Sequence, residues 1–332
     1  MNSVKHYRLV FNGEVLNAWC GVADARPAGG GLAPGVPVSV FFTGHAQRPL
    51  DARRFTGELA RLSRSGLVIM PVMDTPCGTD ARYHGDRGKV VMLMALIEAV
   101  LAERGLAVAG APALPVEVLG VPGVQAGLVA VSLQVVGWSH GGLLARRFAS
   151  AYPQSVVGLG QVCPAGYHHW PSWPKLVLDF VRESRRIAPM LLGPQAPDVL
   201  RANCGILRGL IGDAGRGLIA ALRRGDLGPA RRCIRDIEDC NELLDDANCP
   251  LERHQRVSVV FGLDDTVITA KLPGFRDCGQ PQAAEIDAFG RRYYAGLAGG
   301  QLSLSFLRGN HLAPVTSCRE YAAAVLAGLE KT

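Results

Sequence analysis

The sequence predicts an α/β protein with a mostly parallel central sheet and helices on both of its faces. Short apolar runs typical of buried strands alternate with longer runs that have helical periodicity, as such a sheet requires. The chain has 332 residues, of which 48% are hydrophobic, so it can bury a large core. The strand-like runs of the sheet are 38–42, 67–72, 133–136, 156–162, 256–261 and 302–306.

The chain begins with a predicted antiparallel hairpin. Two strand-like runs, 7–11 and 14–19, are joined by Asn12-Gly13, which is a strong two-residue turn signal. Beyond the first buried strand, the run 50–63 has one apolar helical face, and the run 89–104 is apolar nearly all round. The second pattern predicts a helix packed closely against the sheet. Helices are also expected at 142–149, at 281–297 and near the C-terminal end, whereas 110–132 is ambiguous apart from a strand-like run at 116–119.

Residues 166–253 interrupt this alternation. They contain no convincing core strand, but they do contain several helical stretches. We therefore expect a helical cap inserted between two parts of the core, 1–165 and 254–332, and closing over a pocket at the strand ends. Aromatic residues gather where this segment begins, and they would either line the pocket or pack the cap onto the core: Tyr167, Trp170 and Trp173.

Composition disfavours several classes of protein. The net charge of +6 is modest and no basic stripe carries interleaved aromatic residues, which disfavours nucleic-acid binding. Nine cysteines without a C-x-x-C pair are typical of reduced thiols, and Cys249 with the nearby His254 does not make a metal site. There is no apolar leader, and no apolar run approaches the ~20 residues of a membrane span. We expect a soluble, cytoplasmic protein that needs no metal or cofactor, and the sequence is compatible with a homo-oligomer.

The most informative stretch is Gly137-Trp138-Ser139-His140-Gly141, a G-x-S-x-G motif between a predicted strand and a predicted helix. This context is that of a nucleophile elbow, in which the serine hydroxyl stands clear of the sheet on a sharp turn. The two flanking glycines would avoid clashes that a Cβ would cause there. The alternative is a glycine-rich turn without chemistry.

Two further strand ends carry residues that could activate Ser139. A serine hydroxyl needs a base to take its proton, and the base needs an orienting acid. Asp264 and Asp265 follow the strand 256–261, and either could be that acid, while the other would cap the turn. His311 follows the last strand and is the candidate base, because open parallel sheets bind ligands at the carboxyl ends of their strands.

A fourth strand end, Thr43-Gly44-His45, is a candidate oxyanion hole. The backbone N–H of His140 would supply one donor for the oxyanion, and Gly44 or His45 would supply the other. Gly44 serving only a tight turn is the alternative. The side chains of His140 and Trp138 beside the serine are expected to line the substrate pocket.

With these residues the chain resembles capped members of the α/β-hydrolase superfamily, and the elbow is similar to that of small carboxylesterases and thioesterases. The resemblance implies the α/β-hydrolase fold. It favours Asp265 as the acid, in a G-x-x-D turn that starts at Gly262, and His311 as the base. The family's H-G turn is replaced by Thr43-Gly44, and the resemblance carries the second oxyanion donor to His45. Asp74 matches a family position that is not normally catalytic.

The sequence therefore predicts a serine hydrolase that cleaves a carboxylic ester or related acyl bond of a small molecule through an acyl-enzyme. A thioesterase or acyltransferase would use the same residues. A lyase on the same fold, or a ligand-binding member without catalysis, are further alternatives.

Overall fold

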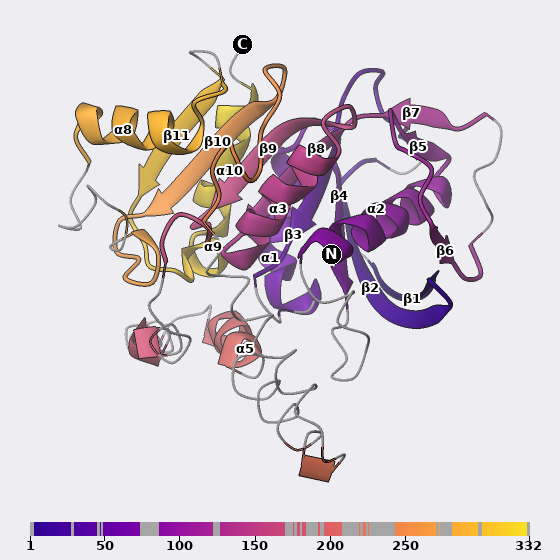
Figure 1. Cartoon of the computed structure of the whole chain (residues 1–332), viewed down its shortest axis with the longest axis horizontal. Coiled ribbons are helices and arrows are strands. Elements are labelled where there is room, and N and C mark those ends of the chain that lie inside the picture. Colours follow the sequence, from indigo (N-terminus) through magenta and orange to yellow (C-terminus); the bar gives the residue numbers. More distant parts are fainter. Residues whose placement is uncertain are drawn as a thin grey trace.

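The computed structural model describes most of the chain. The described residues are 3–27, 30–44, 47, 49–73, 86–121, 127–169, 175, 178–179, 181–183, 192, 196–207, 219, 222–223, 225, 243–269, 272, 281–297 and 301–330. Figure 1 shows a twisted sheet with helices against both of its faces, which confirms the predicted α/β architecture.

Within the described residues the main sheet has nine strands, and its larger part is parallel. In spatial order this part consists of β11 (Leu302–Leu307), β10 (Arg256–Gly262), β9 (Val156–Val162), β8 (Leu133–Trp138), β3 (Val38–Phe42) and β4 (Leu67–Met73). The antiparallel part continues with β2 (Glu14–Asp24), β1 (Ser3–Phe11) and β6 (Val116–Val118). Strands β3 and β8 are buried along their whole lengths, as expected for central strands covered on both faces.

The N-terminal hairpin is confirmed. Val10 pairs with Val15, and both turn residues have positive φ, 49° at Asn12 and 83° at Gly13. A two-residue hairpin turn with positive φ at both positions matches the twist of the strands, which explains the Asn-Gly sequence. Strand β2 then pairs antiparallel with β4 and so joins the hairpin to the parallel strands.

Helices cover both faces of the sheet. On one face lie α2 (Asp86–Ala102), α3 (His140–Ala151) and α8 (Ala283–Tyr293), and on the other lie α1 (Arg53–Leu62) and α10 (Cys318–Glu330) (Figure 1). Helix α2 contacts β4 and β6, which accounts for its apolar residues on all sides. It ends before the predicted position 104, because the chain there turns into β5 (Leu106–Val108), which pairs with β7 (Val129–Val131).

The segment 166–253 lies between β9 and β10, and none of its described residues belongs to a strand. Its helix α5 (Ala196–Leu207) contacts η1 (Pro49–Ala52), which follows β3, and α9 (Ala313–Thr316), which follows β11. Helix α5 is therefore placed at the edge of the sheet where these strands end (Figure 1). In the part of the chain that the structure describes, no helix is long and apolar enough to cross a lipid bilayer.

Candidate active site

Ser139 occupies a strained turn between β8 and α3. Its backbone has φ 57° and ψ −124°, a conformation that L-residues rarely adopt and that costs ~1–3 kcal/mol. The turn is tight enough that a Cβ on Gly137 would lie 2.0 Å from the carbonyl oxygen of Gly141, and a Cβ on Gly141 would lie 2.1 Å from that of Phe42. Both glycines of the motif are thus required by close backbone approach.

The structure brings Ser139, His311 and Asp265 into one hydrogen-bonded chain. His311 Nε2 lies 2.9 Å from Ser139 Oγ, and His311 Nδ1 lies 3.0 Å from Asp265 Oδ2. The three residues follow three different parallel strands, β8, β11 and β10, at the same edge of the sheet. Asp265 and His311 are buried, whereas the serine keeps a small exposed fraction of 8%.

The hydrogen bonds of Asp265 fix which of its oxygens faces the histidine. Oδ1 accepts two backbone N–H groups, from Val267 and Ile268, each at 2.9 Å. Oδ2 is left to face His311 Nδ1. With Asp265 ionised, the proton of a neutral His311 sits on Nδ1, and Nε2 accepts the hydrogen bond from Ser139.

Asp264, the other candidate acid, has a different position. It is exposed, its Oδ2 accepts the backbone N–H of Gly309 at 3.0 Å, and its own N–H donates to the Gly309 carbonyl at 3.0 Å. Asp264 therefore ties the loop after β10 to the loop after β11. Of the two aspartates, Asp265 contacts His311.

The structure describes only part of the predicted oxyanion hole. Helix α3 begins at His140, so the backbone N–H of this residue belongs to the first turn beside Ser139. Gly44 lies next to the serine, since a Cβ on it would be 3.6 Å from Ser139 Cβ. The Gly44 N–H donates to Gln47 Oε1 at 3.0 Å, so this group is engaged within the turn, and its predicted role as an oxyanion donor stays a prediction. His45, the other candidate, lies outside the described residues.

Trp138, predicted to line the substrate pocket, contacts the loop that carries His311. Its side chain is 1% exposed, and its indole Nε1 donates to the carbonyl oxygen of His311 at 3.1 Å. The tryptophan therefore supports the loop that carries His311. His140 is also buried.

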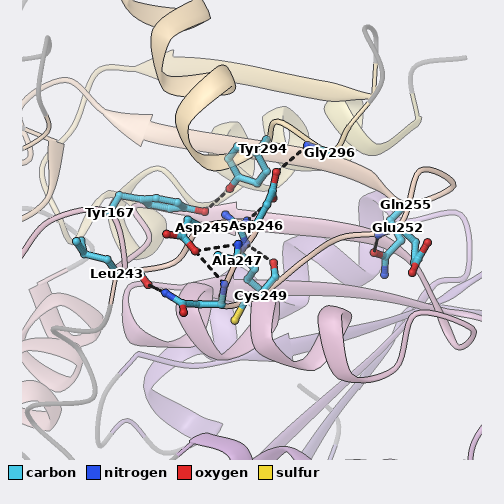
Figure 2. A network of polar contacts seen from close by, with 12 residues as sticks. Tyr167, Leu243, Asp245, Asp246, Ala247, Cys249, Glu252, Gln255, Tyr294 and Gly296 are labelled. Carbon is cyan, nitrogen blue, oxygen red and sulfur yellow. Dashed lines mark hydrogen bonds and ion pairs between the residues drawn. The ribbon is translucent and has the colours of Figure 1, made fainter.

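Tyr167 packs the start of the 166–253 segment onto the core. Its ring contacts the rings of Phe289 and Tyr293, and its hydroxyl donates to Gln161 Oε1 at 2.8 Å. The same hydroxyl also bonds to that of Tyr294 (Figure 2). The packing alternative considered for the aromatic residues therefore describes Tyr167. Trp170 and Trp173, predicted with it, lie outside the described residues, as does Asp74.

The end of the same segment is tied to the core through a buried arginine of α3. Arg146 Nη2 pairs with Asp246 Oδ1 at 3.0 Å, its Nε donates to the carbonyl of Cys249 at 3.3 Å, and its guanidinium lies 4.6 Å from the ring centre of Tyr294. Figure 2 shows Asp246 and Tyr294, two of these partners, close to each other. Charge pairing and ring contact together compensate the burial of Arg146.

Three residues near the site were not singled out from the sequence. Gln47 holds the Gly44 turn, because it also donates its N–H to the Gly44 carbonyl at 3.2 Å and accepts the Thr43 hydroxyl. Cys163 follows β9 and is buried. Burial raises the pKa of its thiol well above the usual value, and the negative charge of Asp265 is the second cause of this increase. The third residue, Glu183, accepts the backbone N–H of His311 at 3.0 Å. Among the described residues, no group of three or more His, Cys, Asp or Glu side chains could hold a metal ion.

Comparisons with known proteins show the fold. No family model and no curated protein matches the sequence. Among solved structures, the chain resembles a probable hydrolytic enzyme from Pseudomonas aeruginosa PAO1 (TM-score 0.52, 15% identity, 99% of this chain and 94% of that one). It also resembles a carboxylesterase structure from the thaumarchaeon Nitrososphaera gargenis (TM-score 0.51, 12% identity, 96% of each chain).

These similarities place the chain in a structural class. The similarity to both solved structures extends over 96–99% of this chain. The chain has the α/β-hydrolase fold, which confirms the fold that the sequence resemblance implied. Because identities of 12–15% are shared by proteins with different activities, the activity has to be argued from the site.

Proposed function

We propose that this chain is a serine hydrolase that cleaves a carboxylic ester or related acyl bond of a small molecule. The observation that carries the proposal is the buried chain of hydrogen bonds from Ser139 through His311 to Asp265, with distances of 2.9 and 3.0 Å. A nucleophile, a base and an orienting acid at these distances are the parts that acyl transfer through serine requires.

In the proposed reaction, His311 Nε2 takes the proton of Ser139 as the serine oxygen attacks the carbonyl carbon. The imidazolium that forms is stabilised by Asp265, and it then gives the proton to the leaving alkoxide, so that an acyl-enzyme and an alcohol result. His311 next takes a proton from water as the water oxygen attacks the acyl carbon, and the imidazolium then returns this proton to the leaving Ser139 oxygen, which releases the acid and restores Ser139 and His311. The backbone N–H of His140 is one proposed donor to the oxyanion, with His45 as the second.

The segment 166–253 is proposed to be the cap over this site, with 1–165 and 254–332 as the core. The contacts of α5 with η1 and α9 support this role, because both elements follow strands that end at the site. The acyl and alcohol pockets would then lie between the cap and the strand ends.

The test is covalent labelling with a fluorophosphonate followed by intact-mass measurement. We expect one adduct on the native chain and none on Ser139→Ala. Ser132→Ala is the matched control, since Ser132 precedes β8 at the opposite end of the same strand and its contact to Val38 uses the backbone carbonyl. An adduct that persists in Ser139→Ala would contradict the proposal. Hydrolysis of paired oxygen esters and thioesters, with and without an added acceptor, then separates an esterase from a thioesterase or an acyltransferase.

A further inference from the structure

One carboxylate from outside the core joins the two loops that carry the proposed acid and base. Glu183 Oε1 accepts the backbone N–H of His311 at 3.0 Å, and Glu183 Oε2 accepts the hydroxyl of Thr266, the residue after Asp265. The two loops follow the neighbouring strands β10 and β11. Glu183 itself belongs to the 166–253 segment.

Glu183 is buried, although a neighbouring leucine on the same helical stretch is exposed. Residues 178–179 and 181–183 are helical, and the acidic Asp179 and Glu183 are 4% and 3% exposed, whereas Leu178 is 45% exposed. Residues four apart share one face of a helix, so an acidic face is turned toward the core and an apolar residue toward the outside. A buried carboxylate is costly unless donors satisfy it. Both oxygens of Glu183 receive such donors, and the donors belong to the two loops.

We infer that Glu183 is a positioning residue for the proposed hydrolysis, which holds the His311 loop and the Asp265 loop in register. This inference rests on the proposed function. Asp265 and His311 come from different loops, so the 3.0 Å contact between them depends on how the loops sit against each other. Misplacement of a reacting group by about 1 Å can cost about 10²-fold in rate. Because Glu183 lies outside the core, assembly of the site depends on where its segment is seated.

The main test compares Glu183→Ala with Glu183→Gln in steady-state hydrolysis of an activated ester. The glutamine keeps an acceptor for the His311 N–H, and its NH₂ can donate to the Thr266 hydroxyl oxygen, so both contacts persist without the charge. We expect kcat to fall by about 10–100-fold in Glu183→Ala with KM changed by less than about threefold, and Glu183→Gln to recover kcat to within about fivefold of the native value. Equal losses in the two variants, or a loss confined to KM, would overturn the inference.

Thr266 supplies a second route that does not alter the buried acid. Thr266→Val removes the hydroxyl and keeps the shape, and Thr266→Ser keeps the hydroxyl and serves as the matched control. We expect Thr266→Val to lower kcat, Thr266→Ser to leave it within about twofold, and Thr266→Val to add little to Glu183→Ala, because both changes break the same contact. We call the two hydrogen bonds that Glu183 accepts from the His311 loop and the Asp265 loop the clamp. Additive losses in the double variant would contradict it.

A spectroscopic measurement separates this inference from the proposed function. The proton between His311 Nδ1 and Asp265 should give a strongly deshielded proton resonance in the native chain, as charge-assisted hydrogen bonds do. We expect the signal to be lost or shifted in Glu183→Ala and kept in Glu183→Gln. If the native chain takes no fluorophosphonate label, the proposed function fails, and this signal still tests the clamp. A signal unchanged in Glu183→Ala would overturn the clamp while leaving the hydrolase proposal standing.

Discussion

Replacing Asp265 by asparagine should disable the proposed base without moving it. Oδ1 of Asp265 accepts two backbone N–H groups, so in Asp265→Asn the amide oxygen has to stay at this position. The NH₂ group then takes the place of Oδ2, 3.0 Å from His311 Nδ1. Since NH₂ can only donate, Nδ1 must accept, and the imidazole proton moves to Nε2. Nε2 then donates to Ser139 and cannot take its proton.

The magnitude follows from this change of tautomer. In a serine protease the equivalent exchange lowers kcat by about 10⁴-fold while the geometry is retained, which corresponds to about 5.5 kcal/mol of transition-state stabilisation. We expect a loss of the same order in this chain, because the Oδ1 contacts of Asp265 leave the amide no alternative orientation. KM should change far less than kcat.

The assay is kcat and KM for an activated ester, together with the rate of fluorophosphonate labelling. Asp264→Asn is the matched control, because Asp264 is exposed and bonds to the Gly309 backbone rather than to His311. It should retain activity within about tenfold, because the amide oxygen of asparagine can still accept the Gly309 N–H. An Asp265→Asn enzyme with more than about a tenth of native kcat would refute the tautomer argument.

Three further results are expected. Gly141→Ala should lower the free energy of unfolding by about 3 kcal/mol or more, since the new Cβ would lie 2.1 Å from a carbonyl oxygen of β3. Gly57→Ala should raise it by about 1 kcal/mol, because Gly57 lies in helix α1 and the new Cβ would meet nothing within 4 Å there. Chemical denaturation measures both changes. Gln47→Met should lower kcat by about tenfold at unchanged KM, because the Gly44 turn loses its amide contact; steady-state kinetics with kcat within twofold of native would contradict this. Burial raises the pKa of the Cys20 thiol from 9.0 to about 12. The contribution of this thiol to the free energy of unfolding is therefore complete below pH 9 and is lost between pH 9 and 12, by about 1.4 kcal/mol per pH unit. Unfolding experiments across this range should show a flatter pH dependence for Cys20→Ala.

Local chemistry in the sequence was sufficient for the main elements. Asn12-Gly13 specifies its hairpin turn, and the glycines around Ser139 specify the elbow, because each requirement involves only a few neighbouring residues. The meeting of Ser139 with His311 could also be anticipated, since parallel strands end at one edge of the sheet. The spacing of the residues did not decide whether Asp264 or Asp265 contacts His311, because this depends on the conformation of the turn after β10. In the structure, Asp265 makes the contact.

Contacts that depend on the orientation of single side chains were out of reach. Trp138 precedes the serine directly, but no local pattern predicts that its buried indole nitrogen donates to the carbonyl of His311. Glu183 lies on a helical stretch whose buried face is acidic, the reverse of the pattern from which a core-facing side is normally inferred. The short strands β5 and β7 have three residues each, too few for a recognisable alternation.

The anchoring of Arg146 limits how the chain could be shortened. A minimal domain that lacked the whole of 166–253 would lose Asp246 and the Cys249 carbonyl, and would leave the guanidinium of α3 buried without its ion pair. Removing one partner of a fully buried pair typically costs about 3–5 kcal/mol; Asp246 is 26% exposed, so we expect a smaller loss here, which is still a sizeable part of the stability of a domain. A viable deletion would therefore have to end before residue 243, or would have to replace Arg146 by an apolar residue. The same reasoning applies to chimaeras in which the 166–253 segment is exchanged: residues 243–253 should be kept together with the domain that contains Arg146.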